Sequence, residues 1–278
     1  FERILAVSAS DSWRRKGLLE AATLTGISVQ VPAQPVWKDN ELKRFTSQTS
    51  RTSGIRLTTG EAGCWLGHLH LIEYVAKANL TSALIVEDDV DWDVALKDQL
   101  ELICPSVRAL QSPDTPSNTT PYGTHWDLLW LGHCGDAIPT TDVQTVQDQS
   151  LPGDGIYIES DGRRTPFPKY LRMAHWSVAP ICTYAYGITS LGASRILGLI
   201  NHGVNAQISE QYQSWCQHGN LRCITVNPEL FHHHMHIGSP ISQIDTVDGW
   251  MEISNHSGTV NIGNSARCHA QTKGARCA

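Results

Sequence analysis

The hydrophobic positions of the chain fall into short apolar runs that alternate with longer segments of helical period. The helical period is clearest after residue 60, where apolar residues recur at intervals of three and four: Ala62, Trp65, Leu66, Leu69, Ile72, Val75 and Ala76. Thr58 and Glu61 stand before them with the spacing of a capping box, which predicts where this helix begins. A second helix is predicted over Trp13–Thr23. The short runs predict β-strands at residues 4–7, 83–86, 127–132, 184–188 and 222–226. Because strands and helices alternate, the pattern predicts an α/β fold, a Rossmann-like, mostly parallel sheet flanked by helices.

Two segments interrupt this alternation. Residues 105–124 are rich in Pro, Ser and Thr, and residues 136–168 carry repeated Pro and Gly. We expect both to be long surface loops within a single domain spanning residues 1–278. Two interpretations stay open for them: insertions without a function, or loops that shape a substrate cleft.

Composition and charge exclude several classes of protein. Hydrophobic residues make up 41% of the 278 residues, which suffices for a core and excludes a disordered chain. The 21 Lys and Arg against 27 Asp and Glu give a formal charge of −6, so the basic surface that nucleic acid binding needs is missing. No window reaches the ~18 to 20 apolar residues of a membrane span, so we expect none within this segment. The chain begins at Phe1, and we expect any signal peptide or N-terminal anchor to lie upstream of it.

Cysteines and glycosylation sequons favour a secretory compartment. The eight Cys residues include no C-x-x-C pair, which leaves buried thiols or disulfides rather than a zinc knuckle. Cys216 and Cys223 flank a predicted turn and can pair with each other, as can Cys268 and Cys277. Asn-x-Ser/Thr sequons occur at residues 79, 118 and 255. We therefore expect the ER or Golgi lumen, or secretion, rather than the cytosol.

An acidic cluster follows the predicted strand at residues 83–86. It consists of five carboxylates within seven residues: Glu87, Asp88, Asp89, Asp91 and Asp93. Two such charges 4 Å apart repel by ~4 kcal/mol at an effective dielectric of 20, so a convergent cluster calls for a cation or for raised pKa values. An EF-hand loop is excluded, because Val94 and Leu100 stand where it needs a glycine and a bidentate acid. The alternatives are a solvated acidic turn or a D-x-D-like element that binds Mg²⁺ or Mn²⁺ at the carboxyl edge of the sheet.

A run of histidines follows the last predicted strand. In an extended segment, His232, His234 and His236 lie on one face and His233 lies on the other. The run contains no H-E-x-x-H pair of the kind that zinc hydrolases use. It is therefore either an exposed polar strip or the source of one ligand that completes a metal site.

Four segments in this order resemble glycosyltransferase family 25. They are TTGEAGCWLGHLHLIEYVAKANLTSALIVEDDVDWD, WDLLWLGHC, CTYAYGITSLGASRIL and LRCITVNPELFHHHMHIG, which together span roughly residues 60–238. The resemblance implies a GT-A fold and the transfer of a hexose, usually galactose, from a UDP-sugar to a glycan or glycoprotein hydroxyl with inversion. It also implies Mn²⁺ or Mg²⁺ as the cofactor.

The resemblance also implies roles for individual residues. Glu87 and Asp88 would bind the nucleotide sugar, and Asp89 with His234 would bind the metal. Arg14 and Arg15 would approach the diphosphate. Among the nine Trp residues, Trp65, Trp126 and Trp130 are predicted to be core residues, and Trp92 and Trp176 are the candidates for stacking on a sugar.

The chain departs from the family pattern at three places, one of which is Gly67, where the family helix often has a serine before His68. The family's N-L-x-x-R-x-D-R-R segment corresponds to residues 7–15, where only the Arg pair is kept. An expected acid corresponds to Asn205, and an amide cannot act as a base. We therefore expect the general base to be Asp245, with Glu210 as the alternative.

These departures keep two further functions open. The first is a catalytically inactive GT-A relative that acts as a binding or partner protein. The second is a metal-dependent hydrolase, for which the sequence shows no positioned nucleophile.

Overall fold

The computed structural model describes residues 1–8, 12–53, 57–111, 120–159, 162–204, 206–240 and 253–272. The helices of the described part are α1 (Trp13–Thr25), α2 (Asp39–Ser53), α3 (Thr59–Lys77), α4 (Leu96–Ala109), α5 (Ser190–Ile200), α6 (Ile208–Gln217) and α7 (Ala266–Thr272). The strands are β1 (Arg3–Val7), β2 (Val29–Gln30), β3 (Ser82–Glu87), β4 (Val90–Trp92), β5 (Leu128–Gly132), β6 (Val143–Gln147), β7 (Ile156–Ile158), β8 (Arg164–Pro166), β9 (Leu171–Trp176), β10 (Ala185–Thr189), β11 (Cys223–Asn227) and β12 (Phe231–His233).

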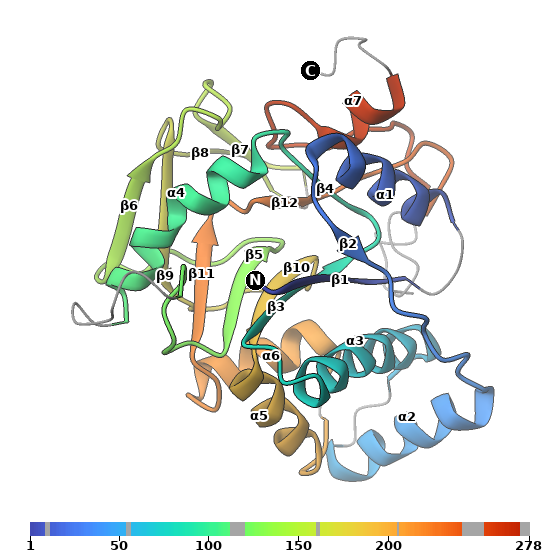
Figure 1. Cartoon of the computed structure of the whole chain (residues 1–278). Helices are drawn as coiled ribbons and strands as arrows, with labels where there is room; N and C mark the ends of the chain where they lie inside the picture. The colour runs from blue at the N-terminus through green and yellow to red at the C-terminus, as the bar shows by residue number, and fades with distance from the viewer. Residues whose placement is uncertain are drawn as a thin grey trace.

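An eight-stranded sheet in the order β2-β1-β3-β10-β5-β11-β9-β6 forms the centre of the molecule (Figure 1). The pairings show that β2, β1, β3, β5, β11 and β6 run in one direction, while β10 and β9 run against them. Two small antiparallel pairs, β12 with β4 and β7 with β8, lie outside this sheet. The structure therefore confirms the predicted α/β class with a mostly parallel central sheet.

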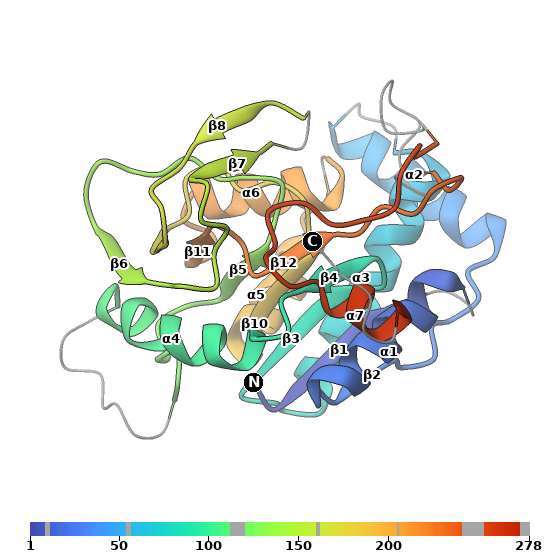
Figure 2. The same ribbon diagram turned by 90° about the horizontal axis from the view of Figure 1, so that it is seen from above.

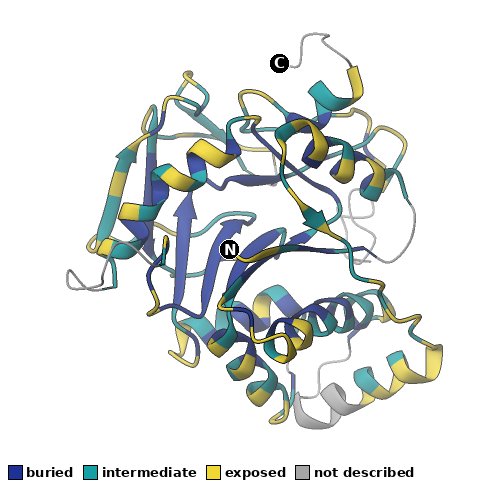
Figure 3. Ribbon diagram, viewed as in Figure 1, coloured by how far each residue is buried: buried dark blue, intermediate teal, exposed yellow. Residues whose placement is uncertain are grey.

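Helices cover both faces of the sheet because successive strand residues point to opposite sides. Leu84 and Val86 of β3 belong to the core shared with α1 and α4, whereas Ala83 and Ile85 belong to the core shared with α3, α5 and α6. The central strands are accordingly buried along their length, and the outer faces of the helices are exposed (Figure 3). This arrangement explains why β3 and β5 appear in the sequence as continuous apolar runs.

The predicted helix and strand positions agree with the structure. Thr58 accepts a hydrogen bond from the backbone N–H of Glu61, and the Glu61 carboxylate accepts one from the backbone N–H of Thr58, so the capping box forms as predicted. The strand predicted at residues 184–188 exists as β10, although it runs antiparallel to both of its neighbours.

The prediction of two long loops was wrong in part. Helix α4 continues through Pro105 to Ala109 because its buried residues Ile103 and Val107 lie on both sides of the proline, and their packing outweighs the lost hydrogen bond. The segment at residues 136–168 contains strands β6, β7 and β8. The glycines and most prolines of this segment lie between the short strands, but Pro166 is the last residue of β8, so the composition did not indicate these strands.

Disulfide bonds connect the strands to neighbouring segments. Cys216 pairs with Cys223, which confirms the first predicted pair, and Cys134 pairs with Cys182. The predicted partner of Cys268, Cys277, lies outside the described residues. Cys64 and Cys104 have free thiols.

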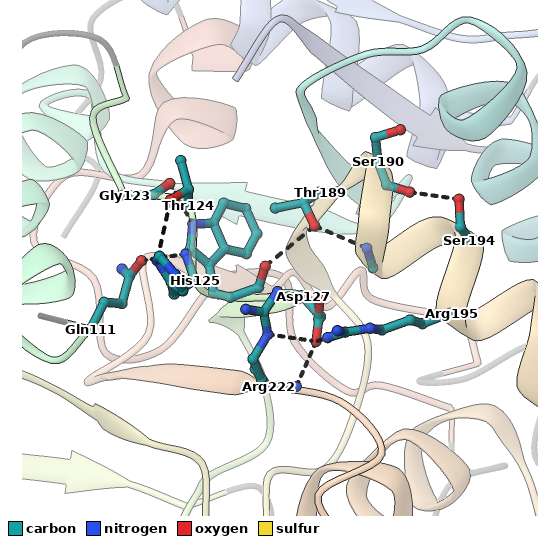
Figure 4. Close-up of polar contacts among 12 residues, drawn as sticks. Gln111, Gly123, Thr124, His125, Asp127, Thr189, Ser190, Ser194, Arg195 and Arg222 are labelled. Carbon is teal, nitrogen blue, oxygen red and sulfur yellow. Dashed lines mark hydrogen bonds and ion pairs between the residues drawn. The ribbon is translucent and has the colours of Figure 1, made fainter. Parts of the chain in front are cut away.

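At the amino edge of the sheet, an ion cluster holds the ends of three elements together (Figure 4). The side chain of Asp127, directly before β5, is fully buried and accepts hydrogen bonds from the guanidinium groups of Arg195 on α5 and Arg222 before β11. The backbone N–H of Arg222 donates to the same carboxylate at 2.8 Å. Burial alone would raise the pKa of Asp127, but the hydrogen bonds from the two arginines lower it below its usual value. The buried charge of Asp127 at this edge of the sheet is therefore compensated by side chains of the same chain.

Candidate functional site

The opposite, carboxyl edge of the sheet collects the polar residues that the sequence analysis selected. Strand β3 ends at Glu87, and the turn at Asp88 and Asp89 leads into β4, which pairs antiparallel with β12. The register places His232 opposite Asp91 and His233 opposite Val90. The acidic cluster and the histidine run, which are more than 130 residues apart in the chain, therefore lie side by side, where open α/β sheets bind ligands.

The acidic cluster divides into two groups with different tasks. Asp91 is fully buried and accepts hydrogen bonds from the hydroxyls of Thr259 and Ser265 and from the backbone N–H of Arg267. Asp93 accepts from the backbone N–H of Asn264 at 2.8 Å. These two carboxylates anchor the segment that leads into α7, so the structure removes them from the expected cation site.

Asp89 is the most buried of the three remaining acids. Its Oδ2 atom forms an ion pair with Arg14 of α1 and lies 3.5 Å from Nε2 of His233, while its Oδ1 atom is buried without a hydrogen-bond partner. Burial alone would raise the pKa of Asp89, but His233 and Arg14 lower it to about 2. The carboxylate is thus ionised, and its Oδ1 atom has no hydrogen-bond partner.

Glu87 and Asp88 flank the end of β1. The hydroxyl of Thr183 donates to Oε1 of Glu87 at 2.7 Å, and the buried Nε2 of His68 lies 3.6 Å from the same oxygen. The hydroxyl of Ser8 donates to Asp88 at 2.6 Å. Burial raises the pKa of Asp88 to about 6, against the lowering effect of the Ser8 hydrogen bond.

The two predicted arginines occupy different positions. Arg14 is buried, and besides Asp89 it binds the carbonyl of Pro240 at 3.1 Å. Arg15 donates from Nε to the hydroxyl of Ser8 at 3.0 Å and from Nη2 to the carbonyl of Ser8 at 2.9 Å. Both guanidinium groups therefore lie near the ends of β1 and β3, and their approach to a diphosphate stays a prediction.

The histidines are placed differently from the predicted assignment. The ring of His234 lies 2.8 Å from the hydroxyl of Thr259 and 3.9 Å from Asp91, and only its backbone contacts Asp89. His233 is the histidine whose ring lies beside Asp89, since it points to the other face of the extended segment. Burial and the Arg267 guanidinium lower the pKa of His234 to about 4, so this ring is neutral at pH 7.

A divalent cation fits these residues in a limited way. Among the described residues, no group of three His, Cys, Asp or Glu side chains is arranged to hold a metal ion. Mg²⁺ and Mn²⁺ are, however, commonly held by one or two protein ligands together with substrate phosphates. The unpartnered Oδ1 of Asp89, with His233 beside the same carboxylate, suits such a site.

The predicted general bases do not receive support from the described geometry. Asp245 and Asn205 lie outside the described residues. Glu210 is exposed in the first turn of α6 and accepts a hydrogen bond from Gln207. Trp65, Trp126 and Trp130 are buried as predicted, whereas Trp92 is wrongly assigned as a sugar platform, because it is 1% exposed and packs against Phe231.

A cavity of about 360 Å³ opens beside the acidic edge, and the sequence analysis did not identify its polar centre. Glu229, which is 4% exposed, lines this cavity together with His232 and His233. The hydroxyl of Tyr157 lies 2.9 and 2.8 Å from the two carboxylate oxygens of Glu229, and Nδ1 of His232 lies 3.0 Å from Oε1. Burial alone would raise the pKa of Glu229, but His232 lowers it to about 2. No sequence signal marks this residue, because Tyr157 and Glu229 are brought together only by the fold.

The β7–β8 hairpin, which lies at the top of Figure 2, contributes Tyr157, Ile158, Glu159 and Gly162 to the lining of this cavity. It is fixed to the C-terminal segment by two hydrogen bonds between Asn261 and the backbone of Ile158, both 2.8 Å long. A neighbouring cavity of about 200 Å³ shares Tyr157 and Glu159 with it. Residues of the segment at 136–168 therefore line two cavities, and whether these bind a substrate stays a prediction.

Comparisons with known proteins agree with the resemblance seen in the sequence. The family model for glycosyltransferase family 25 (LPS biosynthesis protein) matches residues 14–113, which include both arginines and the Glu87–Asp88–Asp89 turn. Procollagen galactosyltransferase 1 of Danio rerio is 23% identical over 223 residues, which cover 75% of this chain and 31% of that protein. Procollagen galactosyltransferase 2 of Homo sapiens is 21% identical over 209 residues, covering 70% of this chain and 28% of the relative.

An inactive relative also matches. Inactive glycosyltransferase 25 family member 3 of Homo sapiens is 34% identical over 80 residues, which cover 29% of this chain and 11% of that protein. The chain thus spans between about a tenth and a third of the length of these curated relatives. Within the part that the structure describes, no helix combines the length and apolar character needed to cross a membrane.

Proposed function

Because the chain belongs to glycosyltransferase family 25, we propose that it transfers a hexose, galactose in the first instance, from a UDP-sugar to a hydroxyl of a glycan or glycoprotein. The family supports a transferase that uses a sugar donor and a glycan acceptor. The proposal of a UDP-sugar donor is based on the carboxyl edge of the sheet. There the acids Glu87, Asp88 and Asp89 lie near Arg14 and Arg15.

The residues at this edge have the chemistry to bind and orient a nucleoside diphosphate. Glu87 offers a carboxylate for ribose hydroxyls and is fixed by Thr183. Arg15, beside it at the end of β1, offers a guanidinium group for phosphate oxygens and is oriented by Ser8. Arg14 is held between Asp89 and the carbonyl of Pro240, so its guanidinium is already oriented before a ligand arrives.

The proposal includes Mn²⁺ or Mg²⁺ as the cofactor, held by Asp89 with His233 rather than the predicted His234 as the neighbouring nitrogen ligand. A divalent cation bound there would neutralise charge on the departing UDP. Arg14 supplies a second positive charge at Oδ2 of Asp89, and the His233 ring lies 3.5 Å from the same oxygen.

Transfer with inversion requires a base on the face of the sugar opposite UDP, within ~2.6 to 3.2 Å of the acceptor hydroxyl or one water away. We keep Asp245 as the proposed base and Glu210 as the alternative. The variant Asp245→Asn should abolish transfer and spare UDP-sugar binding, whereas Asn205→Asp should leave transfer unchanged or raise it. Loss of UDP-sugar binding in Asp245→Asn would contradict the proposed role.

The secretory pathway is the proposed location, in the lumen of the ER or Golgi or after secretion. Its support is the pair of disulfides, which persist in oxidising compartments. Exposed asparagines head two of the sequons, at Asn79 and Asn255. Peptide mapping of the protein isolated from its natural source, before and after removal of N-glycans, checks both modifications.

The experiment that tests the function is a thermal-shift panel of UDP-sugars with and without Mn²⁺. A bound ligand stabilises the native state by mass action, by ~2.7 kcal/mol at a concentration 100 times its Kd. We expect the largest shift with UDP-galactose in the presence of Mn²⁺. The absence of a shift with every UDP-sugar, with and without Mn²⁺, would contradict the proposal.

A second candidate is a catalytically inactive relative that binds a ligand or a partner. The observations that favour it are the inactive human family member among the relatives and the altered segment at residues 7–15. A protein that binds UDP-galactose but transfers nothing to any acceptor, and in which Asn205→Asp restores transfer, would support this candidate.

A further inference from the structure

The cavity beside the acidic edge is separate from the expected position of the nucleotide. The nucleotide-binding residues follow β1 and β3, whereas the cavity is lined by His133 after β5, by Glu229 after β11 and by the β7–β8 hairpin. The two regions meet at His233, which lines the cavity and lies 3.5 Å from Asp89. A ligand in the cavity would therefore be adjacent to a donor bound at the acidic edge without sharing its place.

The carboxylate of Glu229, at the polar centre of the cavity, can accept more hydrogen bonds than the described side chains donate to it. An ionised carboxylate offers about four acceptor positions. The described side chains that donate to Glu229 are the Tyr157 hydroxyl and the His232 ring. A buried carboxylate gains from further hydrogen bonds, so donors from a ligand, such as sugar hydroxyls, complete its surroundings.

The walls and the charge of the cavity favour a neutral ring over a phosphate. Tyr157 and Tyr184 line it, and the Tyr184 ring is stacked on His233 with a centroid distance of 5.4 Å. Aromatic faces of this kind can pack against the apolar C–H face of a pyranose. Its described lining includes the acids Glu159 and Glu229 but no Lys or Arg, which disfavours an anion. The volume, about 360 Å³, falls in the range of ~300 to 1,000 Å³ that small-molecule sites occupy.

We propose that this cavity is the acceptor subsite and that it takes a neutral pyranose, one of whose hydroxyls donates to Glu229. The proposal rests on the transferase function proposed above. Tyr157 is its positioning residue, because its hydroxyl fixes both carboxylate oxygens of Glu229.

Binding of simple glycosides tests the proposal without an identified acceptor. The probes are methyl glycopyranosides of galactose, glucose, mannose and xylose, observed by saturation-transfer NMR, and UDP with Mn²⁺, measured by calorimetry. We expect at least one glycoside to bind, with and without UDP. Glu229→Gln should weaken that binding about tenfold or more and leave UDP affinity unchanged.

Two further variants keep the test decisive if Glu229→Gln fails to fold. Tyr157→Phe keeps the ring and removes the hydroxyl, so it should weaken the glycoside several-fold, about as expected for one lost hydrogen bond. Tyr122→Phe is the matched control, since Tyr122 is a buried tyrosine of the core beyond the cavity lining, and it should change neither affinity.

The outcomes separate this proposal from the one on which it rests. UDP binding without binding of any glycoside would overturn the acceptor subsite and leave the donor proposal intact. Displacement of the glycoside by UDP, or unchanged glycoside binding in both Glu229→Gln and Tyr157→Phe, would also overturn it. Glycoside binding that depends on Glu229, in a protein that does not bind UDP, would support the pyranose site and contradict the transferase.

Discussion

The two edges of the central sheet use buried carboxylates in opposite ways. At the amino edge, Asp127 is bound by Arg195, Arg222 and a backbone N–H, and its charge is fully compensated. At the carboxyl edge, Asp89 keeps an unpartnered oxygen, and burial raises the pKa of Asp88 to about 6. The charge of Asp127 is thus paired within the chain, whereas that of Asp89 is incompletely paired, a pattern that is more frequent at binding sites. Variants at each edge should therefore separate stability from binding.

The largest effect is expected for Asp89→Asn at the carboxyl edge. Loss of this carboxylate should weaken Mn²⁺-dependent UDP binding by about 100-fold, since charged contacts to a metal and a diphosphate are among the stronger ones. The fold should be retained, because Asp89 belongs to a turn and not to the hydrophobic core, but the free energy of unfolding should also fall, because buried Arg14 loses its partner. Calorimetry with UDP and Mn²⁺ measures the affinity, and circular dichroism measures the fold. Unchanged metal-dependent affinity would exclude Asp89 from the binding site.

Asp127→Asn at the amino edge should lower stability without weakening UDP binding. The amide cannot compensate two arginines, so the free energy of unfolding should fall by about 2 kcal/mol, less than for fully buried partners because both arginines are partly exposed. UDP affinity should not change. Urea unfolding measures the loss, and Asp98→Asn, an exposed acid in the first turn of α4, is the matched control. Equal stability of the two variants would mean that the amino-edge cluster contributes little.

Variants of the two neighbouring histidines test which of them contributes to metal binding at the carboxyl edge. His233→Ala should weaken Mn²⁺-dependent UDP binding by about tenfold, because the His233 ring lies beside Asp89. His234→Ala is the matched comparison and should have the smaller effect, since its ring contacts Thr259. Titration of Mn²⁺ into the UDP complex of each variant ranks the two. A larger effect at His234 would restore the ligand predicted from the sequence.

The smallest expected effect concerns the pH dependence of stability at Asp88. Its pKa is raised in the folded state from 3.8 to about 6, so the folded state binds the proton more tightly than the unfolded chain. This contribution to stability is complete below pH ~4 and is lost as the pH rises through ~6. Asp88→Asn should therefore raise the free energy of unfolding at pH 7 by about 1 kcal/mol, allowing for solvent near this side chain, and change it little at pH 4.

Urea unfolding in EDTA and without nucleotide measures this contribution, since a bound cation would remove the effect. Asp154→Asn, an exposed acid of the segment before β7, is the control and should show no such pH dependence. A gain at pH 4 equal to the gain at pH 7 would show that ionisation of Asp88 is not the cause.

The sequence predicted those features that depend on local pattern. The capping box of α3, the buried runs of β3 and β5 and the position of the acidic turn all follow from residues close together in the chain. The sequence did not predict which distant segments of the chain pair with each other, or in which register. The register of β12 on β4 places His233, not His234, beside Asp89, and a shift of one residue reverses which face a side chain occupies. The Tyr157–Glu229 contact joins residues 72 positions apart, and no local pattern marks either of them.

The anchoring of the C-terminal segment by Asp91 and Asp93 has a consequence for the order of events during synthesis. Residues 259–267 supply partners of Asp91, and Asn261 holds the hairpin wall of the cavity, so the cleft depends on residues that leave the ribosome well after the acidic cluster, Thr259 being 168 positions after Asp91. A nascent chain stopped before residue 253 contains every acid of the motif but leaves the buried Asp91 without these donors. The acidic cluster is thus synthesised early, whereas the cleft beside it is complete only after residues 259–267 have been added.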